Sequence, residues 1–289
     1  MIPAGFEYHA PRSVADAVRL LGTLGPEAKL LAGGHSLLPM MKLRLAQPGH
    51  LIDLGRIPDL RGIRQVGSEI RIGAMTTEHD LLNSALLAEK LPLLVEGAGW
   101  IADPQVRYKG TIGGDIAHGD PGNDHPALML ALEASFVLTG PQGERVLPAD
   151  GFYLDLYTTQ LAADEVLSEI RIPIPPPGTG WSYQKLKRKT GDFATAATAV
   201  MLQMNGARVA KVHIALTNAA ATVVKARAAE ASLVGKAIDN VSLNEAARLA
   251  MSVCAPGADQ RGDVEYKVAM CGEMTRRALL AAHARTPRP

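Results

Sequence analysis

The chain has 289 residues, 47% of them apolar and 20% charged, which is typical of a globular protein large enough for two or three modest domains. Its 30 basic and 29 acidic residues give a formal net charge of +1, so there is no strong field to attract nucleic acid. The two cysteines, Cys254 and Cys271, have no spacing that indicates a disulfide framework, a zinc site or an iron–sulfur cluster. No signal-peptide pattern and no run of about 18 apolar residues occurs, and we therefore expect a cytoplasmic location.

Helix and strand signals alternate in the first part of the chain. Ser13 can cap a helix whose apolar residues recur at helical spacing, and short apolar runs predict strands. In chain order the patterns predict a helix over 13–25, a strand over 28–32, a short helix over 36–45, a strand over 50–54, a hairpin over 63–74 with its turn at Gly67–Ser68, a helix from Thr76 and a buried helix over 91–102.

The next segment, 110–134, has five glycines and two prolines before it becomes apolar. It predicts a long ordered loop that leads into a buried helix from about Pro126, and loops of this length are usually functional. Beyond it the patterns predict a hairpin over 135–147, a strand over 165–174, a proline-rich break over 173–180, a hairpin over 195–218 with its turn at Asn205–Gly206, and helices over 225–234, 242–253 and 264–282. We expect a domain boundary at the break, because proline cannot continue a strand ladder.

Two glycine pairs are the most informative feature of the sequence. Gly33–Gly34 lies where a predicted strand passes into a predicted helix, and missing side chains there allow backbone N–H groups to approach a phosphate. The spacing matches neither GxGxxG nor the P-loop, so it indicates neither a Rossmann nucleotide site nor a triphosphate site. Alone, the pair favours a tight turn without a ligand. A second pair, Gly113–Gly114, suggests that two glycine turns hold one pyrophosphate from opposite sides.

The motifs around these glycines carry a resemblance to a known family. They are "AGGHSL" at 32–37, "TIGGD" at 111–115, "GDPGND" at 119–124 and "KLKRKTGDFATAA" at 185–197. Over its whole length the chain resembles the FAD-binding medium subunits of molybdenum hydroxylases, the xanthine dehydrogenase and aldehyde oxidase family. Within that family it is most similar to the medium subunits of aerobic carbon monoxide dehydrogenases.

The resemblance implies an α+β architecture in two domains. Residues 1–175 would form a two-subdomain FAD-binding fold of the PCMH/VAO type, with subdomains of about 1–56 and 57–175. Residues 176–289 would form a small C-terminal α+β domain of the carbon monoxide dehydrogenase flavoprotein type. FAD would be bound noncovalently, with its ADP part between the two subdomains.

The resemblance also implies which residues contact FAD. Backbone N–H groups of 32–37 and 111–115 would hold the pyrophosphate and the neighbouring sugar, and the loop at 119–124 would bind ribose or ribityl hydroxyls. The expected cofactor-binding residues are Ala32, Gly33, Gly34, His35, Ser36, Leu37, Thr111, Ile112, Gly113, Gly114, Asp115, Asp120, Asn123, Asp124, Lys185, Asp192 and Phe193. No residue is expected to act as a catalytic residue or as a metal ligand.

The implied function is electron transfer within a larger assembly. FAD would take electrons from [2Fe-2S] clusters on a small iron–sulfur subunit and pass them to an external acceptor, while a large subunit would hold the molybdenum cofactor. A dimer of heterotrimers is expected, in the cytoplasm, with peripheral attachment at the inner face of the membrane left open. The substrate and the acceptor stay unassigned.

Four other functions remain open, one of which is a flavin reductase of the cell-wall precursor type, although no residues specify its sugar-nucleotide site. The chain could be the medium subunit of an aldehyde or N-heterocycle hydroxylase, because these relatives share the flavin motifs. It could be a self-contained oxidase with FAD bonded to His35, or an interaction subunit that has lost its cofactor.

Several expected site residues also have a simpler structural interpretation. His118, Asp120, Asp124 and His125 could form a metal cluster or only a solvated turn. The cationic run that begins at Lys185 could be a solvated strand face.

Phe193 could cover the isoalloxazine or lie in the core.

Asp115 departs from the family pattern, which has asparagine here. A carboxylate about 4 Å from a phosphate charge would be repelled by on the order of 4 kcal/mol, so Asp115 should face a hydroxyl or a backbone N–H instead.

Overall fold

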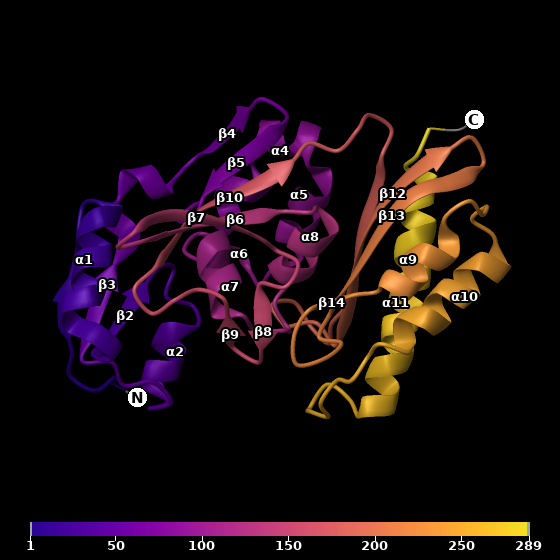
Figure 1. Cartoon of the computed structure of the whole chain (residues 1–289). Coiled ribbons are helices and arrows are strands. Elements are labelled where there is room, and N and C mark those ends of the chain that lie inside the picture. The colour runs from indigo at the N-terminus through magenta and orange to yellow at the C-terminus, as the bar shows by residue number, and fades with distance from the viewer. Residues whose placement is uncertain (1, 288–289) are drawn as a thin grey trace.

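The computed structural model describes residues 2–287, which form three main sheets and the helices that cover them (Figure 1). The strands are β1 Glu7–His9, β2 Ala28–Leu31, β3 His50–Asp53, β4 Ile63–Val66, β5 Glu69–Gly73, β6 Ser135–Gly140, β7 Gly143–Pro148, β8 Tyr153–Asp155, β9 Thr158–Thr159, β10 Val166–Pro173, β11 Gly180–Leu186, β12 Ala196–Asn205, β13 Arg208–Thr217 and β14 Val224–Lys225. The α-helices are α1 Val14–Leu24, α2 Leu37–Lys42, α3 Glu78–Leu82, α4 Ala85–Lys90, α5 Pro92–Trp100, α6 Pro104–Arg107, α7 Ile112–His118, α8 His125–Ala131, α9 Arg227–Leu233, α10 Asn240–Met251 and α11 Val264–Ala284. Among these residues, no helix is both long enough and apolar enough to cross a bilayer.

The first sheet is parallel and has the strand order β1-β3-β2. Helix α1 begins where predicted, because the Ser13 side chain accepts a hydrogen bond from the N–H of Asp16. Its buried residues share one small core with Ile52 of β3. The strand, glycine turn, short helix and strand predicted over 28–54 are thereby confirmed, with the glycine pair between β2 and α2.

The second sheet is antiparallel, in the order β4-β5-β10-β6-β7. Both predicted hairpins are present, β4–β5 around Gly67–Ser68 and β6–β7. The helix predicted over 91–102 is α5, which is almost entirely apolar and packs into the core of this part of the molecule.

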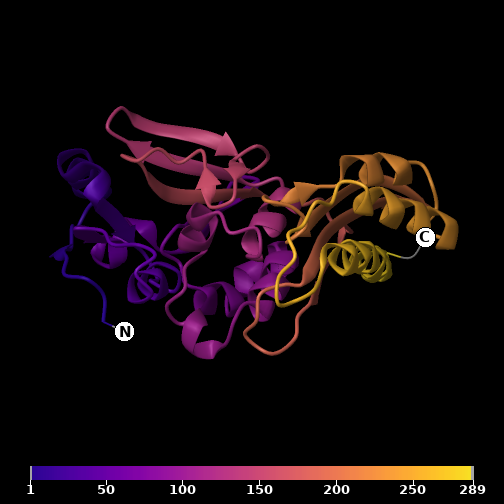
Figure 2. The ribbon, with the colours of Figure 1, turned by 90° about the horizontal axis from the view of Figure 1, so that it is seen from below.

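The third sheet, β11-β12-β13-β14, lies between two layers of helices. In Figure 1, α9 and α11 cover one face and α5 and α8 the other, and Figure 2 shows the same third sheet and α9–α11 in the orange and yellow half of the chain. The hairpin at Asn205–Gly206 is confirmed. Helix α10 is capped by Asp239 rather than by Ser242, whose side chain instead completes a capping box.

The segment 110–134 is the main place where the sequence prediction is wrong. Seven residues of the predicted loop, Ile112–His118, form helix α7, and Gly113–Gly114 lies in its first turn. Thr111 caps this helix by accepting a hydrogen bond from the N–H of Gly114, and Gly119 ends it in the left-handed conformation. Glycine is unfavourable within a helix, but Gly113 packs so closely against Ala74 that a larger side chain would not fit.

Candidate functional site

A cavity of about 900 Å³ connects the two glycine pairs with the C-terminal part of the chain. This volume is near the upper end of the range for ligand pockets. Its lining brings together fifteen of the seventeen expected residues, namely Ala32, Gly33, Gly34, His35, Ser36, Leu37, Thr111, Gly113, Gly114, Asp115, Asn123, Asp124, Lys185, Asp192 and Phe193. The other two, Ile112 and Asp120, are not among the lining residues: Ile112 is fully buried in the core.

The first glycine segment has free hydrogen-bond donors. Gly34 has φ +78°, a conformation that side chains disfavour. A side chain on Gly33 would collide with the backbone of the other segment, since a Cβ would lie 2.2 Å from the carbonyl oxygen of Lys109. Within the described residues, the N–H groups of 33–36 make no hydrogen bond. Backbone donors that lack an acceptor among the described residues are suited to bind an anion.

The second glycine segment differs, because its N–H groups already have partners. Ile112 donates to Thr76, Gly113 to Ala74, and both Gly114 and Asp115 to Thr111. A Cβ on Gly113 would lie 2.4 Å from that of Ala74, so this glycine serves chain packing. Pyrophosphate contacts from 111–115 stay a prediction and would require these N–H groups to share their bonds.

Asp115 lines the cavity with a buried carboxyl group, one oxygen of which has no hydrogen-bond partner among the described residues. Burial raises the pKa of Asp115 to about 8, and the nearby carboxylates of Glu78 and Asp124 add to this effect. The neighbouring His125 opposes this shift, and the group takes up a proton more readily than an exposed aspartate does. The repulsion expected for a carboxylate beside a pyrophosphate is correspondingly reduced.

Glu78 and His125 form a buried ion pair beside the cavity, and the sequence analysis did not identify it. His125 Nε2 is 2.8 and 2.9 Å from the two carboxylate oxygens of Glu78, and both side chains are almost inaccessible. Burial disfavours the imidazolium, but the adjacent Glu78 outweighs it and raises the pKa of His125 to about 9. Glu78 is also part of the cavity wall.

The possible metal cluster at 118–125 is not supported by this arrangement, because its side chains have separate partners. His118 packs against the Tyr157 ring with centroids 5.0 Å apart, while His125 pairs with Glu78. Asp120 accepts a hydrogen bond from the N–H of Gly122, as expected of an Asx turn.

Asp124 and Lys185 form a second buried pair, and both line the cavity. Lys185 Nζ lies 2.7 Å from the Asp124 carboxylate, which also accepts a hydrogen bond from the Tyr183 hydroxyl at 2.5 Å. Only 1% of the Lys185 side chain is exposed, so the solvated-face interpretation is wrong for this residue. Arg188 and Lys189 are exposed, but they lie beyond the end of β11 at Leu186 and so form no strand face.

Phe193 and Asp192 enter the cavity from the C-terminal part of the chain. Phe193 is 46% exposed, so the interpretation as a core phenylalanine is wrong. Its position is fixed by Arg261, whose guanidinium lies over the ring and also pairs with Asp192 at 2.7 Å. Hydrogen bonds from Arg261 and Arg188 lower the pKa of Asp192 to about 2. An exposed aromatic ring beside the cavity is available to a planar ligand.

Two family models match nearly the whole chain. Residues 4–175 match the FAD binding domain in molybdopterin dehydrogenase, and residues 181–282 match the CO dehydrogenase flavoprotein C-terminal domain.

Similar proteins point the same way. The chain is 60% identical to the carbon monoxide dehydrogenase medium chain of Hydrogenophaga pseudoflava, and the alignment covers 99% of both chains. It is 36% identical to the nicotine 6-hydroxylase medium subunit of Paenarthrobacter nicotinovorans, again over 99% of both. A solved structure of the Hydrogenophaga pseudoflava carbon monoxide dehydrogenase superposes with a TM-score of 0.99 at 61% identity, covering 99% of this chain and 100% of that one.

The FAD-binding domain followed by a C-terminal domain of the CO dehydrogenase flavoprotein type, which the family resemblance implied, is confirmed by these matches. The chain belongs to the family of FAD-binding flavoprotein chains of the molybdopterin dehydrogenases, with the C-terminal domain of the CO dehydrogenase flavoproteins.

Proposed function

We propose that this protein is the FAD-carrying medium chain of a carbon monoxide dehydrogenase-type molybdenum hydroxylase. The observation that carries the proposal is the cavity, which joins both glycine pairs to Lys185 and Phe193 in a chain 60% identical to such a medium chain. Identity to the nicotine 6-hydroxylase medium subunit is lower, at 36%, which favours the carbon monoxide enzyme over an N-heterocycle hydroxylase.

The residues present fit FAD. The free N–H groups of 33–36 are placed to bind a pyrophosphate, and the unpaired Asp115 oxygen offers a hydrogen-bond site to a sugar or ribityl hydroxyl. The exposed Phe193 ring provides a wall for a flat ring system. When bound, FAD supplies the group that accepts and releases electrons singly or in pairs.

The chain's own residues then orient and enclose the cofactor. The Asp124–Lys185 pair holds the C-terminal part of the chain against the loop after α7. Arg261 keeps Asp192 and Phe193 at the cavity, so the site needs both halves of the sequence. We place the domain boundary at about residue 176, between β10 and β11.

The proposed reaction path uses two partner chains. A small subunit with [2Fe-2S] clusters delivers electrons, a large subunit carries the molybdenum cofactor, and an external acceptor takes electrons from the flavin. We propose a dimer of such heterotrimers in the cytoplasm.

The test is to purify the chain together with its partner chains and to analyse the complex for FAD, iron and molybdenum. The proposal is contradicted if the chain purifies as a homogeneous protein that has no partners and does not bind FAD.

A matched pair of glycine variants tests the cavity itself. Gly34→Ala introduces a side chain at φ +78° in the lining of the cavity, with its Cβ 2.9 Å from the Leu38 side chain. Gly206→Ala introduces comparable strain at φ +58° in a hairpin where nothing lies within 4 Å. We expect a lower flavin content for Gly34→Ala only. If both variants contain the same amount of flavin, FAD does not bind in this cavity.

The competing covalent oxidase depends on His35, which is exposed and lines the cavity. Precipitation with acid distinguishes the two states of the cofactor. We expect the yellow colour to stay in the supernatant, because noncovalent FAD is released when the protein unfolds. Colour that stays with the pellet would support a bond to His35.

A further inference from the structure

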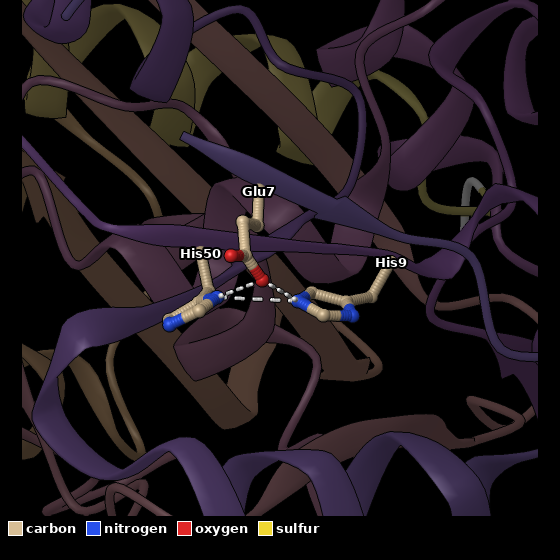
Figure 3. Close-up of side chains that lie close together, drawn as sticks. All are labelled: Glu7, His9 and His50. Carbon is tan, nitrogen blue, oxygen red and sulfur yellow. Dashed lines mark hydrogen bonds and ion pairs between the residues drawn. The ribbon is translucent and has the colours of Figure 1, made fainter. Parts of the chain in front are cut away.

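A second group of polar side chains lies on the first sheet, away from the cavity. Glu7 and His9 are two residues apart on β1, and therefore point to the same face of the strand. β1 pairs with β3 in parallel register, which places Glu7 directly opposite His50. Figure 3 shows the three side chains pointing toward one another, and none of them lines the cavity.

The distances within this group suit a bound metal ion. His9 Nε2 and His50 Nδ1 are 3.2 Å apart, His50 Nδ1 is 3.4 Å from a Glu7 carboxylate oxygen, and His9 Nε2 is 4.0 Å from that same oxygen. Tetrahedral ligands with bonds of about 2.1 Å to zinc lie roughly 3.4 Å from one another. The three atoms thus approximate one face of a tetrahedron, and small rotations of Glu7 would complete it.

Hydrogen bonds within this group depend on one shared hydrogen. A neutral imidazole nitrogen carries either a hydrogen or a lone pair, so a hydrogen on His50 Nδ1, for example, would serve both the Glu7 carboxylate and the lone pair of His9 Nε2. A cation that faces three lone pairs satisfies all three atoms at once. The imidazole side chains are about a quarter exposed, at 26% and 24%, and Glu7 is 75% exposed, so an ion and its remaining water ligands have access from solvent.

We propose that Glu7, His9 and His50 form a binding site for one divalent transition metal ion, with zinc as the fitting ion. Two imidazole nitrogens and one carboxylate oxygen are a ligand set that zinc accepts with a fourth position left to water. The ion joins β1, a strand of only three residues at the edge of its sheet, to the neighbouring β3. Its expected role is to fix the N-terminal strand.

Zinc binding to the purified full chain is the direct test. The chain is stripped with chelator, dialysed and titrated with zinc chloride in a calorimeter, and cobalt chloride supplies a visible spectrum that reports coordination geometry. We expect one zinc per chain. The affinity for zinc should be at least about tenfold weaker in His9→Ala, His50→Ala and Glu7→Gln, because the loss of a residue that only supports a metal ligand already weakens metal binding by about 10- to 100-fold. Zinc should also raise the melting temperature of the unaltered chain.

His79→Ala is the matched control. His79 is a partly exposed histidine on α3 that stacks on Tyr108 and takes no part in the group. It should bind zinc like the unaltered chain. Circular dichroism of every variant confirms folding, and Glu7→Gln preserves the size of the side chain. The proposal is overturned if the unaltered chain binds no stoichiometric zinc, or if the three ligand variants bind it as tightly as the His79→Ala control.

Discussion

Asp115 places an unpaired carboxyl oxygen inside the protein beside the cavity. Its pKa is about 8 in the folded chain, while an unfolded aspartate titrates near 4. Between these values the native state holds a proton that the unfolded state has lost, so the free energy of unfolding falls as pH rises from about 4 to 8. Above about pH 8 the free energy of unfolding no longer changes with the titration of Asp115.

Asp115→Asn should remove this pH-dependent loss. We expect the variant's melting temperature, relative to the unaltered chain, to increase steadily from pH 5 to 8, with a stabilisation on the order of 5 kcal/mol at most. Thermal unfolding of flavin-free protein measures it, and the exposed Asp59→Asn provides a flat control. The variant should retain FAD. A difference that does not change with pH would mean that Asp115 is ionised throughout.

Glu78 should stabilise the fold through His125, and most strongly at low pH. Glu78→Gln removes one partner of a buried ion pair, which typically costs about 3–5 kcal/mol. The folded pKa of His125 lies above its unfolded value, so the stabilisation is fully present below about pH 6.5 and is lost as pH rises through about 9.

Urea unfolding at pH 6 and pH 9.5 tests this dependence. The difference between Glu78→Gln and the unaltered chain should be larger at pH 6, while Glu144→Gln, on the exposed side of β7, should change stability by less than about 0.5 kcal/mol. The charged-pair assignment is wrong if the loss is the same at both pH values.

At the scale of elements, helix α7 depends on a glycine that local propensity disfavours. A Cβ on Gly113 would lie 2.4 Å from the Ala74 side chain and 2.6 Å from its carbonyl oxygen. Gly113→Ala should therefore push α7 away from the end of β5, with a destabilisation of about 1–3 kcal/mol and a lower flavin content.

Gly99→Ala on α5 is the control for that substitution. Its new Cβ would meet only a Leu82 methyl group at 3.7 Å, an ordinary contact, so helix propensity should make it neutral or stabilising by up to about 1 kcal/mol. Denaturant unfolding and flavin content of the two variants give the comparison. Equal stability would show that α7 can shift without cost.

Local patterns explain which elements the sequence predicts well. The hairpins at Gly67–Ser68 and Asn205–Gly206, and the capped helix at Ser13, depend on neighbouring residues, and all three are confirmed. Helix α7 was missed because Gly113 and Gly114 disfavour a helix locally, and the close contact of Gly113 with Ala74 is made by a residue far away in the sequence.

The same reason limits the prediction of the site. The glycine motifs and family resemblance led to most of the cavity lining, since these signals are contiguous segments. The pairs Glu78–His125 and Asp124–Lys185 join residues 47 and 61 positions apart, and no periodicity relates such positions. Glu7 and His50 meet only because β1 and β3 are neighbours in a parallel sheet.

At the scale of the whole molecule, the two halves of the sequence share one hydrophobic core. Residues of β11, β12 and β13, such as Tyr183, Ala197 and Ala215, belong to the same buried cluster as Leu94 of α5 and Leu128 of α8. The C-terminal helices have a second core on the other face of the third sheet. The boundary proposed near residue 176 therefore divides the sequence without dividing the main core.

Shared burial predicts that the chain unfolds as one cooperative unit. It has two tryptophans, Trp100 on α5 and Trp181 on β11, so single-tryptophan variants report the two halves separately. In Trp100→Phe and Trp181→Phe, urea transitions followed by fluorescence and by far-ultraviolet circular dichroism should coincide within each variant, because neither half keeps a complete core alone. Fluorescence and circular dichroism midpoints that separate, with the Trp181 signal changing first, would mean that the third sheet and its helices unfold independently of the cavity.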